Sequence, residues 1–357
     1  MSQIRLVIAD KDALYLEKLS AYLQKNKAYG FYLELYTDKN KLVEWLSSGK
    51  RTDLLVISAS LYNELAEKPV NKNILLLRDC AESLAPQNIN SINKYRPADY
   101  ILKEILSLCA EYIPRDINDE NKNGCINLVL YADGSDALNP LAQGLAYINA
   151  VRKKKVYYMS LDEFPNTNSW LNSNNTKGLS EMLYYVKSQK ENLSLKAEAC
   201  TSCDTKTGIY FMKGHNNPED VKSLNEGELT SLLKAVQRSL PYDEIIISRA
   251  FITDQITLWL LNAAGRVFVS ALNYKSSIDR LNRIVNHINR FENVYGLKEK
   301  LVFCINSISD NQLPINLDNP NLNIVNLPYL DNRNAGLFPL SNEYLTTLEA
   351  AVNNPEV

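Results

Sequence analysis

The sequence predicts an α/β protein built from two domains, each a doubly wound parallel sheet with helices on both faces. The chain has 357 residues, which suggests about two domains at roughly 100–200 residues each. Short apolar runs alternate with segments of helical apolar spacing, and this alternation implies right-handed crossovers between parallel strands. Segment 114–124 (PRDINDENKNG) holds almost nothing that can be buried. We therefore expect it to link a first domain, 1–113, to a second, 125–357.

The composition fits a globular protein and excludes several functions. Hydrophobic residues make up 45% of the chain and charged residues 22%, so wholesale disorder is excluded. Lys and Arg number 39 against 41 Asp and Glu, which argues against nucleic acid as the main partner. With two histidines, His215 and His287, sites that need several imidazoles are nearly excluded. No apolar run approaches the roughly 18 residues that span a bilayer, and we expect a soluble cytoplasmic protein.

The first domain begins with an apolar run that could be a buried parallel strand, followed by a helix with Leu16, Leu19 and Leu23 on one face. A flavodoxin-like sheet is the simplest arrangement of such alternating elements. The expected strands are Ile4–Ala9, Leu33–Tyr36, Asp53–Ser58, Asn73–Leu77 and Asp99–Lys103, and the expected helices are Ala13–Lys25, Asn40–Ser48 and Glu104–Tyr112.

The second domain has the same alternation on a larger scale, and the Asn-rich stretch Asn166–Asn175 is expected to be a loop. The expected strands are Ile126–Tyr131, Val156–Leu161, Gly208–Met212, Glu244–Ile247, Arg266–Ala271, Lys300–Asn306 and Asn323–Leu327. The expected helices are Leu141–Val151, Gly178–Ser188, Glu226–Leu240, Ser276–Phe291 and Glu343–Val352.

Charged residues at strand ends make the first domain resemble the receiver domains of response regulators. In that family the first strand ends in two adjacent carboxylates that hold Mg²⁺, the third ends in a phosphorylated Asp, and the last carries a Lys. The resemblance places Asp10, Asp12 and Lys103 in the acidic site and Ser58 at the position of the phosphoacceptor. Lys11 stands where the second acidic residue belongs.

These departures predict a domain that is not phosphorylated. A carboxylate can form an acyl phosphate beside a bound Mg²⁺, whereas an unactivated hydroxyl such as that of Ser58 cannot readily do so. We therefore interpret Asp10, Asp12 and Lys103 as relics and the domain as an interaction module, a pseudo-receiver. A residual acidic site is the alternative.

A small polar loop after the strand Ile126–Tyr131 could hold phosphate. It leads into a helix with Pro140 in the first turn and Asn139 as a candidate cap, so backbone N–H groups would point into the loop. This context resembles the MinD/ParA group of deviant Walker-A ATPases, and later segments match that family in order. They are Lys154–Asp162, Gly178–Lys187, Tyr242–Phe251, Val302–Asn306 and Val325–Pro328. The nucleotide pocket that this resemblance implies consists of Gly134, Ser135, Asn139, Asp162, Asn306 and Pro328.

The residues that carry catalysis in that family are replaced. Leu138 stands at the P-loop Lys position, Asp133 at the signature Lys position, Asn139 at the Mg²⁺-binding hydroxyl and Ser248 at the Walker-B Asp. In P-loop enzymes the Lys and Mg²⁺ neutralise phosphate charge, whereas Asp133 and Asp136 add negative charge here. We expect no catalytic residue, no metal and no cofactor. ATP bound without hydrolysis is the alternative.

A receiver-like domain followed by a MinD/ParA-like domain is the arrangement of the TadZ/CpaE pilus-assembly proteins, which the whole chain resembles in its order of parts. The resemblance implies a localisation factor of the Tad (Flp) pilus and secretion machinery. It would act as a homodimer beneath the inner membrane or at the cell pole and recruit machinery proteins. An ATP-driven dimerisation switch and a partition-like DNA-binding protein are the alternatives.

Three further features are weak signals. Cys200 and Cys203 form one CxxC, whereas a zinc knuckle needs two more ligands. The basic run Arg152–Lys155 could touch anionic lipid, but cations also sit favourably at a helix C-terminus. The basic residues of the helix Ser276–Phe291 and its flank are diluted by acidic ones and suit a solvated face.

Overall fold

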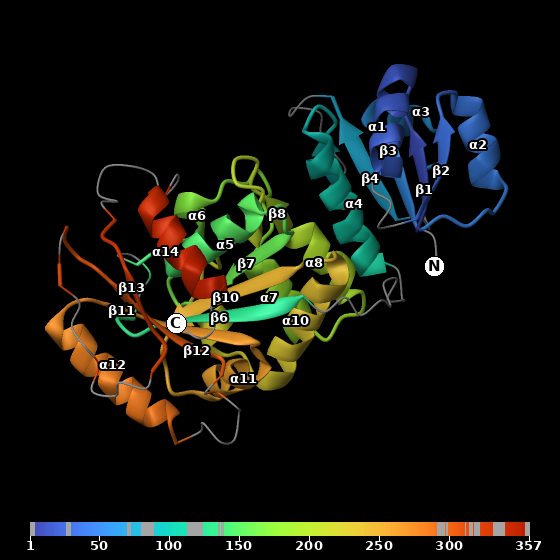
Figure 1. Ribbon diagram of the computed structural model, residues 1–357. Coiled ribbons are helices and arrows are strands. Elements are labelled where there is room, and N and C mark those ends of the chain that lie inside the picture. The colour runs from blue at the N-terminus through green and yellow to red at the C-terminus, as the bar shows by residue number, and fades with distance from the viewer. Residues whose placement is uncertain are drawn as a thin grey trace. The chain divides into compact units, whose positions relative to one another are not determined.

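Figure 1 shows the computed structural model of the chain. The structure describes residues 4–25, 30–69, 73–79, 89–112, 124–134, 136, 139–290, 297, 299–310, 312–313, 317, 322–330 and 340–353. Apart from Gly124, the expected linker lies outside these residues. The chain divides into two compact units: the first holds Met1–Asn121, Tyr185–Cys200 and Lys234–Leu240, and the second holds Lys122–Tyr184, Thr201–Leu233 and Pro241–Val357.

The first unit contains a five-stranded parallel sheet in the order β2-β1-β3-β4-β5. This is the strand order of a flavodoxin-like, doubly wound fold, and the expected fold class is confirmed. The strands are β1 (Ile4–Ala9), β2 (Phe31–Tyr36), β3 (Leu54–Ser58), β4 (Ile74–Arg78) and β5 (Asn90–Asn93).

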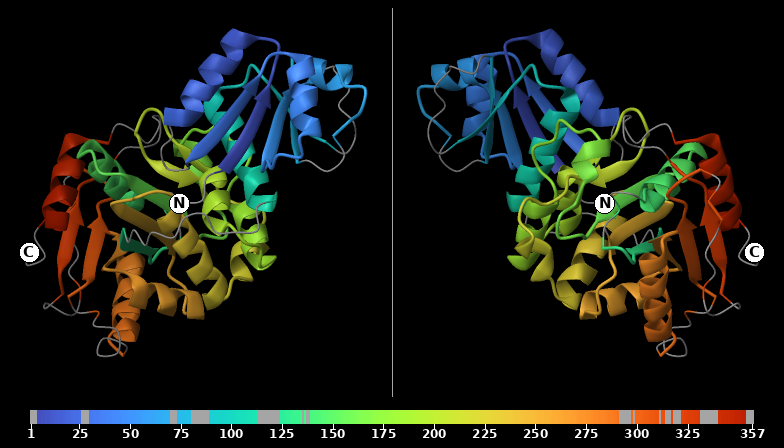
Figure 2. Two further views of the ribbon diagram at one scale, coloured as in Figure 1. Left: turned by 90° about the vertical axis from the view of Figure 1, so that its right-hand side faces the viewer. Right: turned by 90° about the vertical axis from the view of Figure 1, so that its left-hand side faces the viewer.

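Alternating side chains on these strands explain why helices cover both faces of the sheet, as Figure 2 shows. Leu6 and Ile8 of β1 pack in one core with helices α1 (Ala13–Lys25) and α4 (Ala98–Tyr112). The intervening Val7 and Ala9 pack in a second core with α2 (Lys39–Ser47) and α3 (Ala59–Glu64).

The predicted strand Asp99–Lys103 is wrong, because these residues form the first turns of helix α4. Pro97 directly precedes the helix, at a place where its fixed φ suits a helix start. The fifth strand is the earlier segment β5, of which only Ile92 is fully buried. Lys103 therefore lies on a helix, where its ammonium pairs with the Asp99 carboxylate at 3.2 Å.

Helix α8 (Leu193–Cys200) belongs to the first unit although it comes much later in the sequence. Leu195 and Ala199 lie in the same core as α4. The buried Lys196 Nζ donates to Ser107 Oγ of α4 at 3.0 Å. The apolar face of α4 is thus covered from two parts of the chain.

The second unit contains an eight-stranded sheet in the order β13-β12-β11-β6-β10-β7-β9-β8. Its pairs are parallel except β8 with β9, so this sheet is mixed at one edge rather than wholly parallel as predicted. The strands are β6 (Cys125–Tyr131), β7 (Val156–Ser160), β8 (Thr201–Cys203), β9 (Tyr210–Met212), β10 (Glu244–Ala250), β11 (Arg266–Leu272), β12 (Leu301–Asn306) and β13 (Ile324–Leu327).

Helices cover both faces of this sheet too (Figure 1). Val129 and Tyr131 of β6 pack with α5 (Leu141–Val151) and α14 (Asn342–Asn353). The alternate residues Leu128 and Leu130 are also buried, and the alternation of side chains along a strand places them on the opposite face of the sheet. The remaining described helices are α6 (Thr167–Trp170), α7 (Leu179–Lys187), α9 (Glu219–Lys222), α10 (Glu226–Ser239), α11 (Gln255–Ala263) and α12 (Lys275–Ile288), and α6 falls within the stretch expected to be a loop.

In the part of the chain that the structure describes, no helix combines the length and the apolar character that crossing a bilayer requires.

Candidate functional site

The acidic residues after β1 are used to build the turn into α1. Asp10 is almost completely buried, and its Oδ1 accepts from the Asp12 backbone N–H at 2.9 Å. Asp12 Oδ1 accepts from the Tyr15 N–H at 3.0 Å, which caps the first turn of α1. The side chain of Lys11 is half exposed and pairs with Glu64. The two aspartates lie next to each other, and each accepts a backbone hydrogen bond.

Ser58 lies fully buried at the end of β3, where the resemblance places it, and serves as the cap of α3. Its Oγ accepts from the Leu61 N–H at 3.4 Å and lies 3.2 Å from Ser60 Oγ. The Ser58 hydroxyl therefore already forms hydrogen bonds within the first turn of α3.

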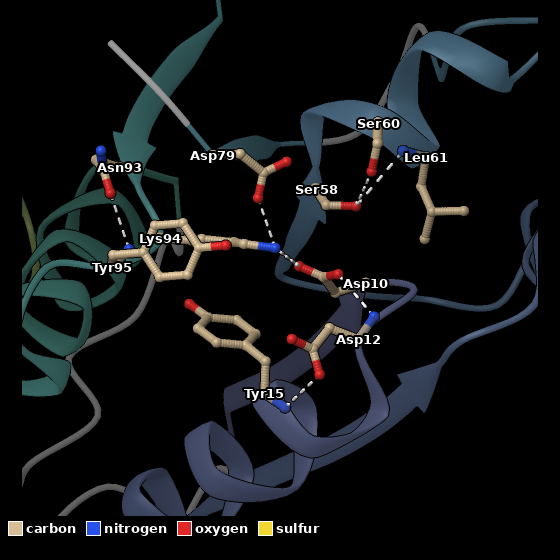
Figure 3. A network of polar contacts seen from close by, with 10 residues as sticks. All are labelled: Asp10, Asp12, Tyr15, Ser58, Ser60, Leu61, Asp79, Asn93, Lys94 and Tyr95. Atoms are coloured by element: carbon tan, nitrogen blue, oxygen red, sulfur yellow. Dashed lines mark hydrogen bonds and ion pairs between the residues drawn. The ribbon is translucent and has the colours of Figure 1, made fainter.

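A lysine that the sequence analysis missed fills the space beside Asp10. Lys94 directly follows β5, and its Nζ lies 3.5 Å from Asp10 Oδ2 and 2.5 Å from Asp79 Oδ1 (Figure 3). The rings of Tyr15 and Tyr95 flank the ammonium, with centroids 5.5 and 5.3 Å away. Such ring faces attract a cation.

Lys94 and not Lys103 is therefore the lysine of this acidic cluster. Burial opposes the charged form of Lys94, but the hydrogen bond to Asp79 and the charges of Asp10 and Asp79 raise its pKa above the ordinary value. The positive charge lies beside Asp10, a residue that the resemblance assigns to a Mg²⁺ site. Burial and the charge of Asp10 also raise the pKa of Tyr15, so its hydroxyl stays protonated.

The turn after β6 has the left-handed backbone expected of a glycine-containing loop, with Gly134 at φ +82°. Ser135 and Leu138 lie outside the described residues. The carboxylate of Asp133 accepts from the Leu272 N–H at 2.9 Å and from Ser277 Oγ at 2.5 and 2.6 Å. Asp133 thus ties the turn to β11 and to the first turn of α12.

The protein's own side chains meet the N-terminus of α5, where a phosphate would bind in an active P-loop. The fully buried Tyr131 hydroxyl accepts from the Ala142 N–H at 3.2 Å. The buried carboxylate of Asp136 accepts from Gln143 Nε2 at 2.5 Å. Burial raises the pKa of Asp136, although the Gln143 hydrogen bond opposes the shift. Neither Tyr131 nor Gln143 could be recognised in these roles from the sequence.

Asn139 and Asn306, both expected to contact nucleotide, are instead joined through Ser270. Asn139 Nδ2 donates to Ser270 Oγ at 2.5 Å, and Asn306 Nδ2 donates to the same oxygen at 3.0 Å. Tyr344 of α14 completes the network by donating to Asn306 Oδ1 at 3.2 Å. All four side chains are buried. Pro328 follows β13 and is half-buried.

Ser248 stands at the Walker-B position on β10, fully buried, with its Oγ 3.0 Å from the Tyr158 hydroxyl. The next residue, Arg249, is buried as well. Its guanidinium donates two hydrogen bonds to Asp254, at 3.1 and 3.0 Å, and Asp254 caps α11. The positive charge of Arg249 is therefore paired with a carboxylate.

Asp162, after β7, accepts from the Ala250 N–H and, at 3.1 Å, from Ser160 Oγ. Burial raises the pKa of Asp162 to about 6, against the effect of the Ala250 hydrogen bond. The buried His215 Nε2 lies 2.7 Å from the Asp162 carbonyl oxygen, so this histidine supports the loop. Asp162 follows the carboxyl end of β7.

The two cysteines of the CxxC and the residues of the basic run lie within the described structure. Cys200 is buried at the end of α8 and Cys203 is exposed at the end of β8. Within the described residues, no group of three or more His, Cys, Asp or Glu side chains could hold a metal. Arg152 pairs with Glu349, and Lys154 pairs with Glu244 at 2.8 Å.

These features define a receiver-like unit with a buried lysine in its acidic cluster. They also define a second unit with a P-loop NTPase fold, in which side chains of the protein contact the N-terminus of the helix after the loop. Residues 2–110 match the family model "TadZ-like, receiver domain". Together with the fold of the second unit, this match fits the TadZ/CpaE-like arrangement of domains. No curated protein matches the chain.

Solved structures resemble the larger part of the chain. A ParA family ATPase from Chlorobium tepidum matches with a TM-score of 0.50 and 13% identity over 65% of this chain and 98% of its own. The MinD cell division protein of Aquifex aeolicus matches with a TM-score of 0.47 and 12% identity over 65% and 98%. At this identity the likeness to the ParA structure shows the fold alone.

Proposed function

We propose that this protein is a non-catalytic localisation and scaffold factor of Tad (Flp) type pilus assembly, which self-associates and recruits components of the secretion machinery. The TadZ-like receiver match supports the assignment to this machinery. The observation that carries the non-catalytic role is the start of α5, where the Ala142 N–H is already bonded to the Tyr131 hydroxyl.

Electrostatics at the same strand ends support this proposal. Asp133, Asp136 and Asp162 place three carboxyl groups around the former phosphate site, and the nearby Arg249 is paired with Asp254. A triphosphate would meet like charges without the lysine that neutralises it in active enzymes. At an effective dielectric of about 20, two unit charges at about 4 Å interact by roughly 4 kcal/mol, so even a screened repulsion weakens binding strongly.

Calorimetry with MgATP tests the non-catalytic role, with an active MinD or ParA protein as the positive control. We expect no saturable heat and no phosphate release by the full chain. A parallel test in cells replaces Ser248 by Ala and Asp162 by Asn. If the protein is a scaffold, both variants should still localise to the cell pole and support pilus assembly. Loss of assembly with variants that remain stably folded would favour a nucleotide-dependent protein.

The alternative is an ATP-binding dimerisation switch of the MinD/ParA type. The retained left-handed turn at Gly134, followed by helix α5, favours it because this backbone shape suits phosphate. Light scattering with and without MgATP separates the two functions. A scaffold self-associates to the same mass in both conditions, and a switch becomes dimeric when the nucleotide is added.

A further inference from the structure

A second candidate site lies at the amino ends of β6, β10 and β11, the opposite end of the sheet from the P-loop-like turn. A pocket of about 200 Å³ is formed there between these strands, helix α5 with the residues that follow it, and the end of α14. It lies entirely within the second unit. None of the residues expected to contact nucleotide lines it.

The lining carries more positive than negative charge. Arg152, Lys154 and Arg266 contribute three cations and Glu244 one carboxylate. Within the described residues, the Arg266 guanidinium donates one hydrogen bond, to the Val352 carbonyl at 2.6 Å. Because a guanidinium has five N–H donors, most of those on Arg266 remain for a ligand. Because Arg152 is paired with Glu349 and Lys154 with Glu244, Arg266 supplies the surplus positive charge, and this charge favours an anion.

Asn149 gives an independent indication of a ligand. Its side chain lines the pocket and is 4% exposed. Nδ2 donates to the Leu145 carbonyl at 3.0 Å, which fixes the orientation of the amide. The carbonyl Oδ1 is buried and has no hydrogen-bond partner within the described structure. A buried acceptor of this kind is normally satisfied, and it calls for a donor such as a hydroxyl.

The rest of the lining suits a small carbon skeleton. Leu145, Ile246 and Phe268 supply apolar surface next to the charged groups. The exposed thiol of Cys125 lies at the same pocket. Polar and charged groups therefore make up most of the lining, with a smaller apolar surface beside them.

We propose that this pocket binds a small organic anion that carries at least one hydroxyl group, either a hydroxycarboxylate or a phosphate ester. Arg266 and Lys154 bind the anionic group, and Asn149 Oδ1 accepts the hydroxyl hydrogen. This site is independent of the proposed scaffold role and of the former nucleotide pocket.

Two matched pairs of probes test this recognition on the full chain. Malate and succinate differ by one hydroxyl, and hydrogen phosphate carries an O–H that sulfate lacks at neutral pH. We expect malate, hydrogen phosphate or both to bind about 10-fold more tightly than the partner without the hydroxyl, which is 1.4 kcal/mol. The pair that shows the difference identifies the carboxylate or the phosphate as the anionic group.

Alkylation of Cys125 provides a local readout. A bound anion should slow its modification by a maleimide, while the exposed Cys203 reacts at an unchanged rate in the same molecule. Absence of protection by all four probes at millimolar concentration would overturn the proposal. Equal protection by both members of each pair would overturn the role of Asn149.

Variants complete the test. Lys154→Gln should weaken protection of Cys125 about 5- to 10-fold, since a hydrogen bond to a charged group is worth about 1.5–3 kcal/mol and solvent at this exposed side chain reduces it. The matched control is Lys155→Gln, which removes the same charge from an exposed neighbour that does not line the pocket. Asn149→Ala should abolish the preference for malate over succinate while the protein stays folded by circular dichroism. Equal effects of the two lysine variants would contradict a specific site.

Discussion

Lys94 is a buried charge whose stabilising partners come from two other strand ends. Its side chain is 8% exposed and that of Asp10 is 3% exposed. The ammonium bridges Asp10 and Asp79, and thereby connects the ends of β1, β4 and β5. A buried ion pair rarely adds net stability compared with apolar residues, but removal of one partner leaves the other uncompensated.

Replacing Lys94 by Met is therefore expected to destabilise the first unit by about 2–4 kcal/mol. Urea unfolding followed by fluorescence measures this change. Lys11→Met is the matched control, because Lys11 also pairs with a carboxylate but is half exposed, as is Glu64. Its effect should be much smaller, since exposed pairs contribute little. Equal effects of the two variants would show that the buried ion pairs of Lys94 contribute no more to the stability of the unit than the exposed pair of Lys11.

Asp162 makes stability depend on pH. Its folded-state pKa of about 6 lies above the ordinary value of an aspartate because of burial, so the folded state binds this proton more tightly than the unfolded chain. The stability that accompanies the proton is fully present below about pH 4 and is lost as the pH rises to about 6 and beyond.

The Asp162→Asn variant removes this titration while keeping an oxygen to accept the Ala250 N–H. We expect its stability relative to the parent protein to increase by about 2 kcal/mol between pH 4 and pH 7. Paired urea titrations at several pH values measure the difference. A difference that stays constant with pH would mean that Asp162 titrates normally in the folded protein.

At the scale of elements, the strands that could be predicted are the buried ones, because their sequences consist mainly of apolar residues. Ile4–Ala9 and the central strands of both sheets belong to this class. β5 could not be found this way, because Asn90–Asn93 has a single fully buried residue. The apolar run after Asp99 instead belongs to the buried face of α4, and Pro97 was the available signal for that helix start.

Helix α5 ends in a left-handed residue that is not glycine. Lys153 has φ +63°, and its backbone N–H bonds to the Ala150 carbonyl at 2.9 Å. A side chain in this conformation costs about 1–2 kcal/mol, whereas glycine adopts it freely but loses more entropy on folding. Glycine is the usual residue at this position of a helix end.

Lys153→Gly should therefore stabilise the second unit by up to about 1 kcal/mol, since relief of strain exceeds the entropic cost. Thermal unfolding measures the change, and Lys155→Gly serves as the control. Lys155 has no left-handed backbone, so its replacement should give no stabilisation. Destabilisation by Lys153→Gly would show that the lysine side chain contributes more than its backbone strain costs.

At the scale of the whole molecule, the sequence indicated which positions depart from the motifs of the families it resembles, but not which side chains contact these positions in the fold. Leu138 and Ser248 could be recognised in order along the chain. The partners Tyr131, Ser270 and Lys94 could not, because each becomes a partner only when strand ends distant in sequence come together. Asn139 and Asn306, which the resemblance assigns to one nucleotide pocket, share Ser270 as a hydrogen-bond partner.

In both units, side chains of the protein contact the groups that the resemblance assigns to a ligand, and from this we predict how the intact protein responds to ligands. A ligand that binds only the folded state stabilises it by about 2.7 kcal/mol at 100 times its Kd. Thermal unfolding with millimolar Mg²⁺ or MgATP should therefore leave the midpoint unchanged, because Lys94 neutralises Asp10 and the Tyr131 hydroxyl occupies the Ala142 N–H. A rise with Mg²⁺ alone would place a metal site in the chain, and a rise that requires ATP would favour the switch over the scaffold.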